Sequence, residues 1–223
     1  MAEKRAQKIL KVLRTTFTMP EWTASSSDPF ETLIMTVISQ NTADRNTEKA
    51  FENLSKCFKI TPEVLANAKP NQIEACLRNA GLYRNKARAI KQISKTILEK
   101  FHGDLEVIMS MSFENARDAL LQFPGVGPKT ADVVLLFAAN RPTLPVDTHV
   151  GRVSKRLGLA PAEGNYEIVR ESLQSFYESK DYLAIHVLLI SHGRKYCKAR
   201  NPICTQCPLS TLCPSKQLLI KNA

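Results

Sequence analysis

Residues 123–131 read FPGVGPKTA, and this segment decides the fold because it lies between two stretches of helical periodicity. Gly125 and Gly127 permit a tight turn and let the backbone approach an anion closely. Pro128 suits the first position of a helix, where its missing N–H costs little. We expect the backbone amides of Gly125, Val126 and Gly127 to face outward near this helix start, which attracts anions. The segment therefore predicts two helices joined by a hairpin that binds phosphate.

A lysine and an aspartate follow this turn. Lys129 could attack a sugar carbon once it is deprotonated, and a helix start with neighbouring cations lowers the pKa of a lysine. Asp147 comes 18 residues later, so the chain can return it to the same cleft, where a carboxylate would stabilise a positively charged transition state. The alternatives are an exposed lysine at a helix end and an aspartate that only caps the next helix.

Helical patterns cover most of the remaining chain. Asp28 and Pro29 have the residue types of a helix start, and Ser112 can cap a further helix. Residues 130–139 are apolar on nearly every side, which predicts a buried central helix. No strand pair with hairpin chemistry is recognisable. We therefore predict an all-α fold. Two prolines within residues 141–145 interrupt the helical pattern and mark a boundary between two helical domains.

Charge points to a polyanionic partner. The formal net charge is +10, and residues 182–223 hold six Lys or Arg and no acid. Such clustering favours nucleic acid, although a basic enzyme indifferent to DNA is the alternative. No apolar run approaches the roughly 20 residues of a membrane span. The short basic N-terminal segment does not resemble a secretory signal, so we expect an intracellular protein, in the cytoplasm of a prokaryote and associated with the nucleoid.

Four cysteines have the spacing C-x6-C-x2-C-x5-C: Cys197, Cys204, Cys207 and Cys213. In a reducing compartment such a group indicates a metal site, and both zinc and a cubane iron–sulfur cluster accept four thiolates. The long arms favour the bulkier cluster. Cys57 and Cys76 lie in helical patterns and are predicted to be buried thiols.

The hairpin lysine, the aspartate and the four cysteines, in this order and spacing, resemble the endonuclease III branch of the helix-hairpin-helix DNA glycosylases. The resemblance extends from about Asp28 through Cys213, and includes the sequences SHGR at 191–194 and YC at 196–197. It implies a six-helix barrel domain with the hairpin, here residues 29–141. It also implies an iron–sulfur domain built from both chain ends, residues 1–28 and 142–223.

The resemblance also implies roles for residues. Lys129 matches the lyase nucleophile and Asp147 the catalytic carboxylate, while the four cysteines match the ligands of a structural 4Fe–4S cluster. DNA contacts are implied for the hairpin (Gly125, Val126 and Gly127), for Lys198 and Arg200 between the first two cysteines, and for Leu82, which matches a leucine that wedges into the duplex.

One departure from the family pattern lies at residues 39–44, which read SQNTAD. Asn41 stands where the family has a glutamine that fills the space left by a flipped base, and asparagine is one methylene shorter. Either Asn41 fills less of the gap or the neighbouring Gln40 contributes. The departure puts the preference for the opposite base in doubt.

The implied activity is that of a bifunctional DNA glycosylase and AP lyase of base excision repair, acting as a monomer on duplex DNA. It would remove oxidised pyrimidines and then nick the strand 3′ to the abasic site by β-elimination. One alternative is a monofunctional adenine or thymine mismatch glycosylase. Those enzymes lack the hairpin lysine, and the adenine enzymes carry a glutamate that would fall at Thr36. The other alternative is a non-catalytic DNA-binding module with a zinc site.

Overall fold

The protein folds into helices and connecting loops in the computed structural model, which describes residues 2–20 and 28–221. No strand occurs in those residues, and the predicted all-α fold class is confirmed. None of the helices in this part of the chain is long and apolar enough to cross a bilayer. The chain divides into two compact units, Ser26–Arg141 and Met1–Ser25 with Pro142–Ala223. The division after Arg141 coincides with the proline segment singled out in the sequence.

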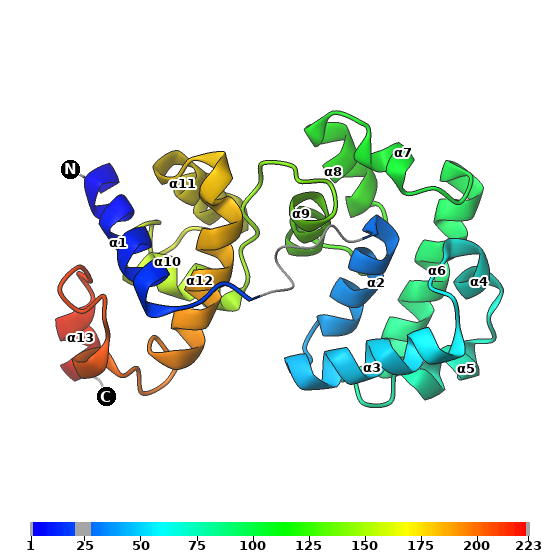
Figure 1. Cartoon of the computed structure of the whole chain (residues 1–223), viewed down its shortest axis with the longest axis horizontal. Helices are drawn as coiled ribbons and strands as arrows, with labels where there is room; N and C mark the ends of the chain where they lie inside the picture. Colours follow the sequence, from blue (N-terminus) through cyan, green and yellow to red (C-terminus); the bar gives the residue numbers. More distant parts are fainter. Residues whose placement is uncertain (1, 21–27, 222–223) are drawn as a thin grey trace. The chain divides into compact units, whose positions relative to one another are not determined.

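The first unit, which we call the hairpin unit, contains eight α-helices among its described residues (Figure 1). They are α2 (Pro29–Ser39), α3 (Asp44–Cys57), α4 (Pro62–Asn67), α5 (Pro70–Cys76), α6 (Tyr83–Phe101), α7 (Glu106–Met109), α8 (Phe113–Leu121) and α9 (Pro128–Phe137). Side chains cap several of them as predicted: Asp28 Oδ1 accepts from the Glu31 amide at 2.9 Å, and Ser112 Oγ from the Asn115 amide at 3.3 Å.

Helix α9 packs against α2 and α8 within the hairpin unit (Figure 1). Every residue from Thr130 to Leu136 is buried, as the all-round apolar pattern predicts. Among these residues Asp132 carries a charge. It is fully buried, and its Oδ1 accepts from Arg117 Nε of α8 at 2.8 Å. This buried ion pair ties together the two helices that flank the hairpin.

The second unit, which we call the cysteine unit, combines α1 (Ala2–Thr16) with α10 (Thr148–Arg156), α11 (Tyr166–Phe176), α12 (Tyr182–Lys195) and α13 (Lys216–Lys221). Its described residues also include the short 3-10 helices η2 (Ser179–Asp181) and η3 (Cys204–Gln206). Helix α1 packs on α11 and α12. Arg5 of α1 donates to the carbonyls of Leu157 at 2.7 Å and Gly158 at 2.9 Å, and Arg14 pairs with Asp181 at 2.6 Å. These contacts explain why the beginning of the chain joins a unit formed mostly by its end.

Candidate active site and nucleic-acid interface

The hairpin between α8 and α9 is closed by its own backbone. The Val126 amide donates to the Phe123 carbonyl at 3.1 Å, and the side chains of both residues are buried. Gly125 has φ +79°, a left-handed conformation that favours glycine. The prediction that the Val126 amide faces outward is therefore wrong. This N–H closes the turn, and the Val126 side chain is buried in the core.

The start of α9 leaves room for an anion. Gly127 is the N-cap, Pro128 follows it, and no side chain caps this end. A Cβ added at Gly127 would meet no heavy atom within 4 Å. The first amides of a helix need partners from outside the helix and carry the positive end of its dipole. An exposed glycine here lets a phosphate reach them.

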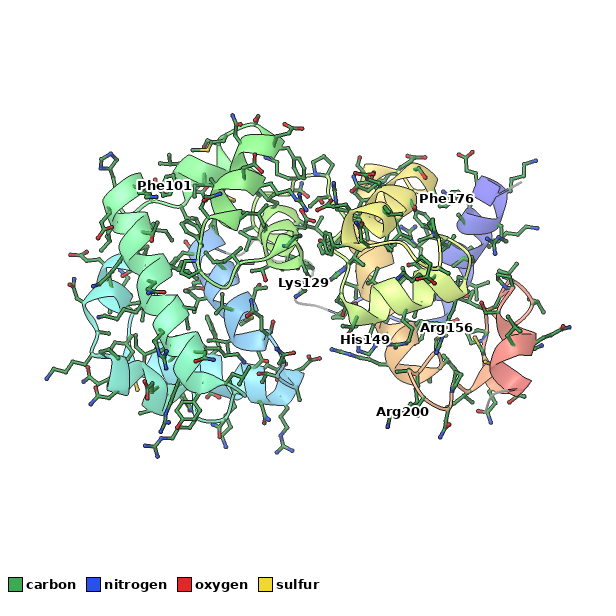
Figure 2. All side chains as sticks on the ribbon, turned by 180° about the vertical axis from the view of Figure 1, so that it is seen from behind. Phe101, Lys129, His149, Arg156, Phe176 and Arg200 are labelled. Carbon is green, nitrogen blue, oxygen red and sulfur yellow. The ribbon has the colours of Figure 1, made fainter. Side chains whose placement is uncertain are left out.

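Lys129 is the second residue of α9, and its side chain is half-buried (Figure 2). The turn and the buried apolar face that follows it, from Thr130 onward, fix the position of its Cα. The sequence prediction that the hairpin delivers a lysine at a helix start is confirmed in this geometry.

Asn41 and Leu82 are exposed and have left-handed backbone, as do His102 and Asn140 in the same unit. Asn41 has φ +51° and Leu82 has φ +58° with 61% of its surface exposed. Their loops touch, because a Cβ added at Gly81 would lie 3.1 Å from the Asn41 carbonyl oxygen. The glycine allows this close approach. The structure thus brings the two predicted wedge residues together on adjacent loops.

Gln40 turns toward the hairpin. Its side-chain Nε2 donates to the Gly125 carbonyl at 2.8 Å and to Thr130 Oγ1 at 3.2 Å. Asn41 is exposed, while Gln40 is only half-exposed. Of the two candidates that the sequence left open, Asn41 has the side chain placed to meet a ligand, and Gln40 has its amide group engaged within the protein.

In the cysteine unit, Asp147 is the N-cap of α10. Its Oδ1 accepts from the Val150 amide at 2.7 Å, so the capping role expected of it is confirmed. This bond uses one of the two carboxylate oxygens, and the residue is half-buried rather than enclosed. Nearby, His149 Nδ1 lies 3.1 Å from Arg152 Nη2. Burial lowers the pKa of the His149 imidazole, so the ring is neutral at neutral pH.

The four predicted metal ligands converge in the cysteine unit. One cavity is lined by all four sulfur-bearing residues, together with Arg156, His192 and Tyr196. Burial, with a smaller contribution from the neighbouring cysteines, raises the pKa of the Cys207 thiol to about 11. Iron binds thiolates, so loading a cluster here would displace protons from these groups. Four thiols around one cavity fit the cluster that the sequence favours.

Basic and imidazole side chains also support this site. His192 Nε2 lies 3.6 Å from Cys207 Sγ, and burial lowers the pKa of this histidine to about 4, so the ring stays neutral. Arg156 Nη1 lies 3.5 Å from Cys197 Sγ and 2.7 Å from the Lys198 carbonyl oxygen; Figure 2 labels Arg156 on α10. Arg152 and Arg156 lie four residues apart on α10, and sequence reasoning could have found them only if the loop after Cys197 were known to fold against that helix.

The backbone of the loop that follows Cys197 is held by two arginines of α10, while its basic side chains are exposed. Arg152 Nε donates to the Cys197 carbonyl at 2.9 Å, and Arg156 Nη2 donates to the Ala199 carbonyl at 3.1 Å. Lys198 and Arg200 are exposed. Their charges are available to a polyanion while the backbone that carries them is fixed.

Residues 34–179 match the HhH-GPD superfamily of base excision DNA repair proteins, and residues 197–213 match the iron–sulfur binding domain of endonuclease III. Endonuclease III of Sulfolobus acidocaldarius is 38% identical over 194 residues, covering 86% of this chain and 85% of that protein. The chain belongs to the endonuclease III family. Endonuclease III of Escherichia coli K12 is 34% identical over 97% of this chain and 98% of its own length. The solved structure of a trapped endonuclease III–DNA covalent intermediate superposes with a TM-score of 0.86 at 31% identity, covering 99% of each chain.

Membership of the endonuclease III family settles the class of activity. The protein is a DNA-binding enzyme of base excision repair, a glycosylase and AP lyase for oxidised pyrimidines. Its four cysteines, Cys197, Cys204, Cys207 and Cys213, ligate a 4Fe–4S cluster. The zinc-bearing, non-catalytic module and the monofunctional mismatch glycosylase considered above are therefore set aside. One further expectation fails: Cys57, predicted to be a buried thiol, is exposed at the end of α3, whereas Cys76 is buried.

Proposed function

We propose that Lys129 is the nucleophile of the endonuclease III reaction in this chain. Its neutral amine attacks C1′ of the extruded nucleotide, a C1′–N bond forms, and the glycosidic bond breaks as the base leaves with its electron pair. The C1′–O4′ bond of the sugar ring then opens, O4′ takes the proton that the amine gives up, and a Schiff base forms at C1′. This Schiff base makes a 2′ proton acidic. Loss of that proton and cleavage of the C3′–O bond nick the strand on the 3′ side. The position of Lys129 at the hairpin-fixed start of α9, in a chain of this family, carries the proposal.

Asp147 is the carboxylate that we assign to charge balance. A leaving base places positive charge on the sugar, and a preorganised carboxylate stabilises such charge most effectively where water is excluded. The Val150 amide fixes the orientation of the Asp147 carboxylate through Oδ1. This bond leaves Oδ2 for the sugar cation.

The remaining assigned residues hold the DNA. The open amides at Gly125 and Gly127 and the exposed Lys198 and Arg200 contact phosphates, which position the duplex without reading its sequence. Extruding a nucleotide costs a few kcal/mol, and less for a damaged pair.

Asn41 and Leu82 occupy the vacated stack. They are exposed on adjacent loops of the hairpin unit, which supports a joint role.

The two units correspond, in this proposal, to the barrel domain and the iron–sulfur domain of the family. The barrel domain is residues 29–141, and the cluster domain is 1–28 with 142–223. The enzyme acts as a monomer on damaged duplex DNA, at the nucleoid in the cytoplasm. The cluster is structural: it joins the four cysteines and so fixes the loop that carries Lys198 and Arg200.

Borohydride trapping tests the nucleophile. Sodium borohydride reduces a Schiff base to a stable amine, so the wild type incubated with duplex DNA containing one abasic site should give a covalent protein–DNA band. Lys129→Gln should give no band and lose at least a thousandfold in strand scission. Lys56→Gln is the matched control, because Lys56 is exposed and pairs with Glu52 on its own helix. A Lys129→Gln protein that still forms the band would overturn the assignment.

A further inference from the structure

Lys86 is an unusual residue in the hairpin unit because a lysine is buried there, with 4% of its surface exposed. It lies on α6. Its Nζ donates to the Ile38 carbonyl at 2.7 Å and to Thr42 Oγ1 at 2.5 Å. No carboxylate forms an ion pair with it among the described residues. Burial lowers the pKa of this amine, so the fold bears a desolvation cost at this position.

The two acceptors of Lys86 bracket one loop. Ile38 is in the last turn of α2, where carbonyls lack helical partners and the helix dipole is negative, so a cation is favoured there. Thr42 is the third residue beyond the end of that helix. Lys86 thereby fastens both sides of the 40–42 loop to α6.

A second clamp acts on the same loop from the hairpin. Gln40 Nε2 donates to the Gly125 carbonyl and to Thr130 Oγ1, next to Lys129 in the chain. The 40–42 loop is therefore joined to α6 on one side and to the hairpin on the other. Between the two clamps Asn41 is exposed on left-handed backbone, with its carbonyl close to Gly81.

We propose that Lys86 and Gln40 are positioning residues that fix the 40–42 loop in advance, so that Asn41 enters the emptied stack in one geometry and discriminates the base opposite the lesion. The proposal rests on the proposed role of Asn41. Asparagine is one methylene shorter than the glutamine of the family pattern. Its side chain therefore has less reach toward the unpaired base, and its position depends more on the backbone of the loop. A loop ordered before binding loses less conformational entropy when it binds, and its donor and acceptor meet the unpaired base at fixed positions.

Lys91 provides a matched control on the same helix. Its Nζ donates to the carbonyls of Ala66 at 2.7 Å and Ala68 at 2.5 Å, at the end of α4. Lys86→Met and Lys91→Met therefore each remove an ammonium that holds two oxygen acceptors. Only Lys86→Met releases the 40–42 loop.

The experiment measures single-turnover scission of duplexes with one abasic site opposite A, G, C or T. A parallel set carries 2-aminopurine opposite the site, whose fluorescence reports displacement of the unpaired base. We define the opposite-base ratio as the scission rate with the fastest opposite base divided by the rate with the slowest. Lys86→Met should reduce this ratio at least fivefold, and should remove more than half of the 2-aminopurine fluorescence change. Lys91→Met should retain both wild-type values within a factor of two, whatever its loss of stability.

Borohydride trapping on single-stranded abasic DNA separates this inference from the proposed function. Single strands offer no opposite base, so Lys86→Met should be trapped there within a factor of two of the wild type. A wild type that forms no covalent adduct on either substrate overturns the proposed function itself. A wild type that is trapped, with a Lys86→Met variant that keeps the full opposite-base ratio and fluorescence change, overturns the positioning role alone.

Milder variants keep the test decisive if Lys86→Met does not fold. Thr42→Val removes the hydroxyl acceptor at nearly constant volume, and Thr42→Ser restores it. Gln40→Ala releases the hairpin clamp and leaves Lys86 in place. Thr42→Val and Gln40→Ala should each narrow the opposite-base ratio two- to threefold, and Thr42→Ser should recover it. Equal ratios in Thr42→Val and Thr42→Ser would contradict a role for the hydrogen bond.

Discussion

The starts of α9 and α10 differ in how the backbone amides of their first turns are satisfied. Helix α9 begins at Gly127 without a side-chain cap, and helix α10 begins at Asp147, whose carboxylate accepts from the Val150 amide at 2.7 Å. The first leaves its amides to an outside anion, and the second satisfies an amide internally. In the proposed function, the uncapped start is a binding feature and the capped start orients a catalytic carboxylate.

The largest expected effect concerns what holds α9 in place of a cap. Asp132→Ala removes the buried carboxylate that pairs with Arg117, and breaking such a pair costs about 3–5 kcal/mol. Urea unfolding followed by circular dichroism should show this loss. Adding Arg117→Met should recover most of it, because two apolar residues replace the buried charges. A loss below about 1 kcal/mol in the single variant would mean that the start of α9 is held by other contacts.

At α10, the charge and the cap of Asp147 can be separated. Asparagine caps a helix as well as aspartate does, so Asp147→Asn should leave the free energy of unfolding within about 0.5 kcal/mol of wild type. Strand scission should fall about 10²- to 10³-fold, because the charge that stabilises the sugar cation is gone.

Asn165 gives the control for this variant, since it caps α11 by accepting from the Ile168 amide at 3.0 Å. Asn165→Ala should lose about 1 kcal/mol of stability with no change in scission rate. Equal scission rates in Asp147→Asn and wild type would leave Asp147 with the cap as its only role.

A third effect tests the turn that leads into α9. Gly125 has φ +79°, and an alanine there is strained by about 1–2 kcal/mol. Gly125→Ala should lower the thermal unfolding temperature accordingly. It should also shift the carbonyl that receives the Gln40 amide. An unfolding temperature equal to that of wild type would show that the turn tolerates a side chain.

The smallest expected effect distinguishes the open helix start from a merely uncapped one. Gly127 has φ −98° and nothing within 4 Å of an added Cβ, so Gly127→Ala should change stability by less than about 0.5 kcal/mol. The dissociation constant for undamaged duplex DNA should still rise about threefold, because a methyl group obstructs the approach of a phosphate to the amides. Unchanged binding in fluorescence anisotropy would argue that DNA does not use this helix start.

Local sequence rules predicted much of this structure. Caps at Asp28 and Ser112, the buried helix after Lys129, and the cysteine spacing are short-range patterns, each with a physical cause that acts within one or two turns. The resemblance to the endonuclease III family supplied what local rules could not, namely roles for Asn41 and Leu82.

Contacts between distant segments escaped prediction. The basic pattern of α6 did not indicate that Lys86 points inward to Ile38, and nothing near Gln40 predicts a hydrogen bond to Gly125, which lies 85 residues away. The Val126 amide was misassigned because a tight turn needs one of its own N–H groups to close. Such contacts depend on tertiary packing, which residue type and spacing do not encode locally.

The packing of α1 on α11 and α12 has a consequence for biosynthesis. At about 5–20 residues per second, the ribosome needs roughly 9 to 36 s after making α1 to complete its partner helices, and domains generally fold as units in that interval. The hairpin unit can thus fold before the partner helices of α1 have been synthesised. Delivery of iron and sulfide then comes last, after Cys213 emerges, when both ends of the polypeptide meet.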